Sequence, residues 1–131
     1  MSDPTSAASV EEARTSIGVI GGGQLAWMLA RAAEGLGISV HVQAPDGSDP
    51  AVHAAASFVQ APVDDVEATR ELARRCGAIT FENEWLPLDA FRHLGREGIR
   101  FLPTLEALRP LISKRQQREL LERLHLPGPR C

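Results

Sequence analysis

The sequence has few cysteines, no long apolar run and no excess of positive charge, and each shortage excludes a class of protein. Its two cysteines, Cys76 and Cys131, have neither metal-binding nor redox spacing, so we expect free thiols. No apolar stretch approaches the roughly 20 residues that cross a bilayer. The net charge is −3, which argues against a nucleic-acid groove or an anionic membrane as partner. These shortages together indicate a cytoplasmic protein.

The sequence also lacks a secretion signal, internal repeats and low-complexity runs. Residues 1–15 are rich in Ser, Ala, Thr and Glu and have no basic start or apolar centre, so we predict a disordered tail. A chain of 131 residues with 44% hydrophobic residues is long enough for one modest core. We therefore predict one folded domain over residues 16–112, followed by a capped helix and the start of a linker over residues 113–131.

A glycine-rich stretch organises the chain. The apolar run Ile17–Ile20 breaks on Gly21, Gly22 and Gly23 and continues as a helical pattern. Glycines allow a tight turn and the close approach of a ligand, and the N–H groups at the helix start favour anions, so we interpret the turn as a phosphate-binding corner. The apolar stripe predicted to face the core consists of Leu25, Met28, Leu29, Ala32 and Leu36. The residues predicted to face away from the core are Trp27, Arg31 and Glu34.

The glycines alone do not make a nicotinamide site. A dinucleotide-binding fold needs an acidic residue about 20 positions further on, at the end of the second strand, to hold the ribose hydroxyls. The predicted second strand, Ile38–Val42, is followed by Gln43, Ala44 and Pro45, and the first acid is Asp46. The sequence therefore disfavours a nicotinamide dinucleotide.

Short strands and helices alternate along the chain. The predicted strands are Ile17–Ile20, Ile38–Val42, Ser57–Gln60, Ala78–Phe81 and Ile99–Leu102. The helical segments after the first helix are Ala51–Ala56, Asp64–Arg75, Leu88–Leu94, Thr104–Leu108 and Ser113–Leu124, the last opening on a capping box of Ser113 and Gln116. This alternation predicts an α/β fold with a doubly wound, mostly parallel sheet. Ligands bind beyond the carboxyl ends of such strands, which points to the glycine corner and to Glu82-Asn83-Glu84.

Three segments together resemble a known family. They are Gly21-Gly22-Gly23-Gln24-Leu25 with Met28-Leu29, then Thr80-Phe81-Glu82-Asn83-Glu84, then the capped helix Ser113–Leu124 leading into Leu126-Pro127. In this order and spacing they are similar to the amino-terminal region of N5-carboxyaminoimidazole ribonucleotide synthetases, which are ATP-grasp ligases. The glutamine after the glycines, together with the Glu-x-Glu after the fourth strand, is fairly specific, because the related formate-using enzyme tends to have glutamate in place of Gln24.

The resemblance implies a Rossmann-like pre-ATP-grasp domain and a ligase of purine biosynthesis. That ligase joins bicarbonate to aminoimidazole ribonucleotide with ATP and magnesium, through carboxyphosphate, and the full-length enzyme is a possible homodimer. The resemblance places Gly22, Gly23 and Gln24 in the ribonucleotide pocket and makes Glu82 and Glu84 its acidic pair, of which one faces the ligand. Lys114 stands where the family contacts ATP phosphates. We expect no catalytic residue and no metal ligand within this chain, since the ATP-grasp domain follows it in the family.

The sequence departs from the family at three positions. Trp27 replaces a usually basic residue, Ala44 replaces the usual Asp at the end of the second strand, and Asn83 takes a slot that is often aromatic. The four histidines are scattered over different elements. Two other classes remain open: a small nucleotide-binding or oxidoreductase domain, and a non-catalytic Rossmann-like interaction domain or gene fragment.

Overall fold

A computed structural model describes residues 11 and 15–129. The tail predicted over residues 1–15 lies almost entirely outside the described residues. In chain order the elements are β1 (Ser16–Ile20), α2 (Gln24–Glu34), β2 (Ser39–Ala44), the 3-10 helix η1 (Pro50–His53), β3 (Ser57–Gln60), α3 (Val66–Ala73), β4 (Ala78–Phe81), α4 (Leu88–Arg96), α5 (Leu105–Leu108), the 3-10 helix η2 (Arg109–Leu111) and α6 (Lys114–Arg123). No helix in this part of the chain has the length and apolar character needed to span a bilayer.

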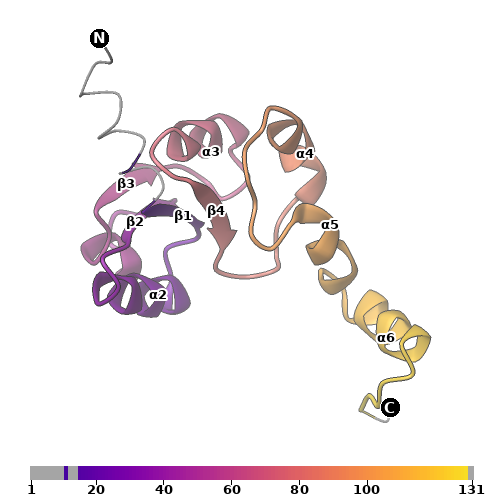
Figure 1. The fold of residues 1–131 in the computed structure, drawn as a ribbon. Helices are drawn as coiled ribbons and strands as arrows, with labels where there is room; N and C mark the ends of the chain where they lie inside the picture. Colours follow the sequence, from indigo (N-terminus) through magenta and orange to yellow (C-terminus); the bar gives the residue numbers. More distant parts are fainter. Residues whose placement is uncertain (1–10, 12–14, 130–131) are drawn as a thin grey trace.

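The strands form one parallel sheet in the order β3-β2-β1-β4 (Figure 1). Because all four strands run the same way, their carboxyl ends lie at one edge of the sheet. β1 lies between β2 and β4, and its Ile20 pairs with Gln43 on one side and with Phe81 on the other. The segments that follow β1, β2 and β4 therefore begin side by side.

The predicted fifth strand is wrong in extent. Residues 99–102 contribute a single bridge, in which Phe101 pairs with Ile79 of β4. The Ile79 N–H donates to the Arg100 carbonyl at 2.8 Å, and the Leu102 N–H donates to the Ile79 carbonyl at 2.9 Å. Pro103 follows this bridge, and α5 begins two residues later at Leu105.

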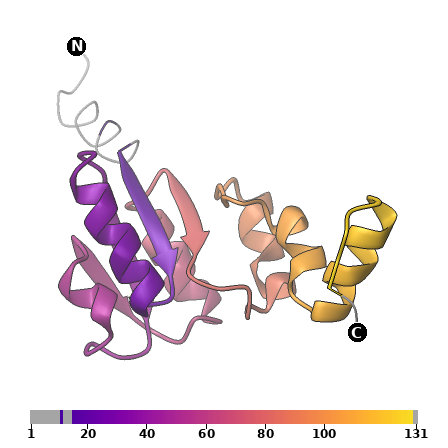
Figure 2. The same ribbon diagram turned by 90° about the horizontal axis from the view of Figure 1, so that it is seen from below.

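Helices cover both faces of the sheet (Figure 2). One face packs on α2 and η1, and its core consists of Val19, Ala26, Ala30, Ala33, Val40, Val42, Ala44 and Ala51. The other face packs on α3, with α4 beside it, around Ile20, Leu72, Ile79, Leu86, Leu88, Phe91, Leu94, Phe101 and Leu108. Alternate residues of a strand point to opposite faces, which is why Val19 and Ile20 belong to different cores.

The predicted inward face of the first helix is wrong. The buried residues of α2 are Ala26, Ala30 and Ala33, whereas Leu25 is 61% and Leu36 is 75% exposed. Met28, Leu29 and Ala32 are also exposed. Both stripes have helical period, and the alanine stripe lies against the sheet because small side chains let the helix axis approach the strands closely. Trp27, Arg31 and Glu34 are exposed as predicted.

The carboxyl-terminal helices extend away from the sheet (Figure 1). α6 has no buried residue among those described, and its first turn is capped by the Ser113 hydroxyl, which accepts the Gln116 N–H at 3.1 Å. The Gln117 side chain donates to the Leu111 carbonyl at 2.6 Å, which ties α6 to η2. The predicted cap is therefore confirmed.

Candidate functional site

The glycine corner is a tight turn held by backbone hydrogen bonds. Gly21 has a φ of +111°, a backbone conformation that residues other than glycine rarely adopt. Its N–H donates to the Gln43 carbonyl at 2.9 Å, and the Gly22 carbonyl accepts the Ala51 N–H at 2.9 Å. Gly23 is the N-cap residue of α2 and provides no side-chain cap. The corner is thus fixed to both β2 and η1.

Glu82 lies directly against this corner. Its N–H donates to the Ile20 carbonyl at 3.0 Å, which continues the pairing of β4 with β1 beyond Phe81. A β-carbon placed on Gly21 would lie 2.6 Å from Glu82 Oε2, and one placed on Gly23 would collide with Glu82 Oε1. The absence of side chains on these glycines therefore makes room for the carboxylate. The two motifs that the sequence singled out meet at one place.

This contact changes the interpretation of the corner. The glycines alone favour an anion, yet the corner already carries the Glu82 carboxylate. Like charges at such short range repel, most strongly where water is partly excluded. The arrangement is better suited to a hydroxyl or amine group that donates hydrogen bonds than to a phosphate.

The turn after β4 fixes the other members of the acidic motif. The Asn83 side chain accepts the Trp85 N–H at 2.9 Å, and the Glu84 carbonyl accepts the Leu86 N–H at 2.9 Å. Leu86 is buried, whereas Trp85 is 72% exposed. Glu84 is partly buried in this turn, and Glu82 is the member of the pair whose side chain packs on the glycines.

Gln24 and Lys114 lie in different parts of the molecule. Gln24 is the first residue of α2, directly after the glycines, and is exposed. Lys114 is the first residue of α6 and is also exposed. Figures 1 and 2 both show α6 well separated from α2 and the sheet. The structure therefore brings Gln24 and Glu82 to one corner and leaves Lys114 apart from it.

Asp49 belongs to the corner, although no sequence pattern predicted a role for it. A β-carbon on Gly22 would lie 2.6 Å from the Ala44 β-carbon, 2.9 Å from the Asp49 β-carbon and 3.0 Å from Asp49 Oδ2. Asp49 is the N-cap residue of η1, but its side chain makes no capping hydrogen bond. The only sequence signal is its place before Pro50 in a turn-rich segment, which indicates a cap rather than a ligand contact.

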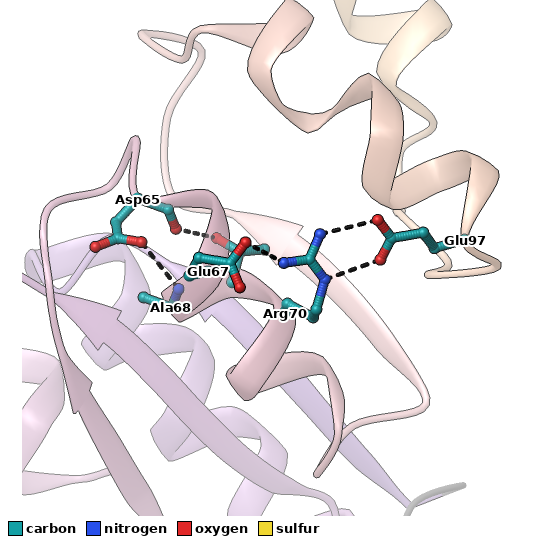
Figure 3. Close-up of polar contacts among 6 residues, drawn as sticks. Asp65, Glu67, Ala68, Arg70 and Glu97 are labelled. Atoms are coloured by element: carbon teal, nitrogen blue, oxygen red, sulfur yellow. Dashed lines mark hydrogen bonds and ion pairs between the residues drawn. The ribbon is translucent and has the colours of Figure 1, made fainter.

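A second polar cluster, between α3 and α4, is structural (Figure 3). The Arg70 guanidinium donates to both carboxylate oxygens of Glu97, at 2.9 and 2.8 Å, and also contacts Glu67. The hydrogen bonds from Arg70 hold the pKa of Glu97 below its usual value, and those to Glu97 and Glu67 raise the pKa of Arg70. Asp65 caps α3 by accepting the Ala68 N–H at 3.0 Å. These contacts join two helices and lie apart from the glycine corner.

A hollow of about 830 Å³ lies beside α4 and α5. Four arginines are among its lining residues: Arg92, Arg96, Arg100 and Arg109. None of the predicted site residues lines it. Over residues 11 and 15–129, no three His, Cys, Asp or Glu side chains come together as a metal-binding group.

A protein-family model decides the assignment. The model of the ribonucleotide synthetase preATP-grasp domain matches residues 14–111, which include the glycine corner, Asp49 and the acidic motif. The chain belongs to this preATP-grasp family. The family and the α/β fold class expected from the sequence are therefore confirmed.

Two curated relatives of this preATP-grasp chain are N5-carboxyaminoimidazole ribonucleotide synthases. The chain is 51% identical over 120 residues to the N5-carboxyaminoimidazole ribonucleotide synthase of Synechocystis sp., a match that covers 92% of this chain and 31% of the relative. It is 54% identical over 114 residues to the synthase of Synechococcus elongatus, covering 87% of this chain and 29% of that relative. The chain thus spans about three-tenths of the length of these relatives.

Solved structures agree with the curated relatives. An Aspergillus clavatus N5-carboxyaminoimidazole synthase in complex with ADP and 5-aminoimidazole ribonucleotide superposes with a TM-score of 0.79 at 32% identity, covering 90% of this chain and 31% of that one. A Staphylococcus aureus N5-carboxyaminoimidazole synthetase complexed with ADP gives 0.73 at 33% identity, covering 82% and 29%.

Proposed function

We propose that this chain is the amino-terminal portion of an ATP-dependent carbon–nitrogen ligase. The ligase would carboxylate 5-aminoimidazole ribonucleotide with bicarbonate to give N5-carboxyaminoimidazole ribonucleotide, in purine biosynthesis. The observation that carries the proposal is the Glu82 carboxylate packed on Gly21 and Gly23, in a family whose Aspergillus member is in complex with that ribonucleotide. The chain supplies one wall of the ribonucleotide pocket.

Each residue of the corner has a task in this proposal. Gly22 and Gly23 let the ligand approach the backbone. The exposed Gln24 amide offers two donors and an acceptor to the ribonucleotide. Glu82 accepts hydrogen bonds from its hydroxyl or amine groups. Glu84, in the turn beside Glu82, is proposed as the second acid of the pocket.

Lys114 is proposed to contact ATP rather than the ribonucleotide. Its exposed position at the start of α6, apart from the glycine corner, supports a separate subsite. Phosphoryl transfer from ATP to bicarbonate depends on positioning and charge neutralisation, to which one lysine contributes a part. The described residues hold no metal cluster, so the magnesium ligands are proposed to lie in the ATP-grasp region of the ligase. A cytoplasmic location and a homodimer of the full-length enzyme are proposed as well.

The test is ribonucleotide-stimulated phosphate release from ATP in the presence of bicarbonate. We expect the full-length ligase to show this release and the 131-residue chain alone to show none. One lysine without a metal ion lowers only a small part of the activation barrier of phosphoryl transfer. Lys114→Ala in the full-length ligase should raise the KM for ATP more than the KM for the ribonucleotide. Arg115→Ala, which removes a neighbouring exposed cation paired with Glu119, is the matched control.

Three results would contradict parts of the proposal. If phosphate release by the full-length ligase does not depend on the ribonucleotide, the ribonucleotide is not the substrate. A larger effect of Lys114→Ala on the KM for the ribonucleotide than on that for ATP would move Lys114 out of the ATP subsite. Turnover by the chain alone, above a blank without protein, would show that the catalytic groups lie within these residues.

A further inference from the structure

The end of β2 carries no acidic side chain. Dinucleotide-binding folds place a carboxylate there, beside the glycine turn, to accept hydrogen bonds from ribose hydroxyls. In this chain β2 ends at Ala44, which is fully buried. If a ribose is bound at this corner, a different residue must accept those hydrogen bonds.

Asp49, five residues after Ala44, places a carboxylate beside the end of β2. The β-carbons of Ala44 and Asp49 both lie within 2.9 Å of the point that a β-carbon on Gly22 would occupy, and Asp49 Oδ2 lies 3.0 Å from it. Asp49 is therefore a neighbour of Ala44 across Gly22. On the other side of the turn, Glu82 packs on Gly21 and Gly23.

The backbone around Asp49 is fixed to the corner. The Asp49 N–H donates to the Asp46 carbonyl at 3.1 Å, and the Asp49 carbonyl accepts the Val52 N–H at 3.1 Å. The Ala51 N–H donates to the Gly22 carbonyl at 2.9 Å, so this loop and the glycine turn are held together. The position of the side chain is thus built into the fold.

The Asp49 carboxylate does not stabilise the helix that it precedes. Asp49 is the N-cap residue of η1, yet its side chain makes no capping hydrogen bond. Within residues 15–129 it also has no ion pair, although it is only partly buried. An N-cap aspartate normally accepts an N–H from its own helix. Here the carboxylate is directed to the glycine turn instead.

We propose that Asp49 binds the ribose of the ribonucleotide by accepting hydrogen bonds from its hydroxyls, in place of the acid that β2 lacks. The inference rests on the proposed function. With Glu82 on the opposite side of the turn, two carboxylates flank the corner. They disfavour the phosphate of the ribonucleotide at this position and favour its sugar.

The experiment uses the full-length ligase and measures KM and kcat for both substrates. Asp49→Ala should raise the KM for the ribonucleotide about tenfold or more, the usual effect of losing a hydrogen bond to a charged group, and should leave the KM for ATP unchanged. Asp49→Asn, which keeps one acceptor oxygen and the side-chain shape, should give a smaller increase. Glu71→Ala removes the same charge from α3, on the opposite face of the sheet, and should change neither KM.

A further arm separates ligand binding from a structural role. Ribonucleotide analogues that lack the 2′ or the 3′ hydroxyl should bind more weakly than the natural ligand to the wild type. They should show little such penalty in Asp49→Ala, because the partner of the missing hydroxyl is already gone.

The outcomes distinguish this inference from the proposed function. A wild-type ligase with no ribonucleotide-dependent activity would overturn both. An active wild type whose KM for the ribonucleotide is unchanged in Asp49→Ala and Asp49→Asn would overturn the role of Asp49 alone. An equal rise in the KM for ATP would also overturn it, since that result indicates general damage to the fold.

Discussion

Replacing Thr69 by valine tests the buried polar link between β2 and α3. Gln43 and Thr69 are both fully buried. The Thr69 hydroxyl donates to Gln43 Oε1 at 2.7 Å, and Gln43 Nε2 donates to the Pro62 carbonyl at 2.7 Å and to the Asp65 carbonyl at 3.2 Å. The backbone carbonyl of Gln43 also accepts the Gly21 N–H, so this residue connects the glycine corner to α3.

Thr69→Val preserves the side-chain volume and removes the donor. Gln43 Oε1 then lies in the core without a partner, and an unsatisfied buried acceptor costs about 1–3 kcal/mol. The extra methyl group of valine offsets a small part of this cost. We expect the free energy of unfolding to fall by about 1–2 kcal/mol. With a urea m-value of about 1.5 kcal/mol per molar, the unfolding midpoint falls by about 1 M.

The assay is urea unfolding of the chain followed by circular dichroism. Thr80→Val is the matched control, because Thr80 is half-buried on β4 and valine favours a strand. Its midpoint should stay unchanged or rise. The double variant Gln43→Leu/Thr69→Val should lose less stability than the sum of the two single variants, since the residues share one network. A Thr69→Val midpoint equal to that of the wild type, with an unchanged m-value, would refute the reasoning.

Four other predictions concern the corner and the thiol. Gln24→Ala in the full-length ligase should weaken ribonucleotide binding by about 1–3 kcal/mol, and an unchanged affinity by calorimetry would refute its role. Gly21→Ala should destabilise the chain by at least about 1 kcal/mol in urea, because φ is +111°, whereas Gly47→Ala, with ordinary contacts, should not. Burial raises the pKa of Cys76 to about 12, so a thiol reagent at pH 8 should label it slowly in a Cys131→Ser background until urea unfolds the chain. The folded chain holds the thiol proton more tightly, so stability should fall as pH rises from about 8.5, the ordinary cysteine pKa, towards 12.

The sequence by itself determined most of the sheet and the place of the corner. Strand-forming runs, the three glycines and the cap at Ser113 are local signals, because each depends on residues close together in the chain. The meeting of Glu82 with the glycines follows from the same signals, since parallel strands end at one edge of the sheet. Which acid of the pair faces the corner was left open, because that depends on how β4 pairs with β1 beyond Phe81.

Tertiary structure alone decided three other features. Two stripes of α2 share the helical period, and only the close approach of the helix to the sheet selects Ala26, Ala30 and Ala33 over the larger residues. Residues 99–102 resemble a strand, yet they pair with β4 through one bridge, between Phe101 and Ile79. The path of the loop after β2 brings Asp49 back to Gly22, a contact set by hydrogen bonds between segments that are distant in sequence. Periodicity and spacing describe each segment separately, and so they specify neither how closely a helix packs on the sheet nor the path of a loop between two elements.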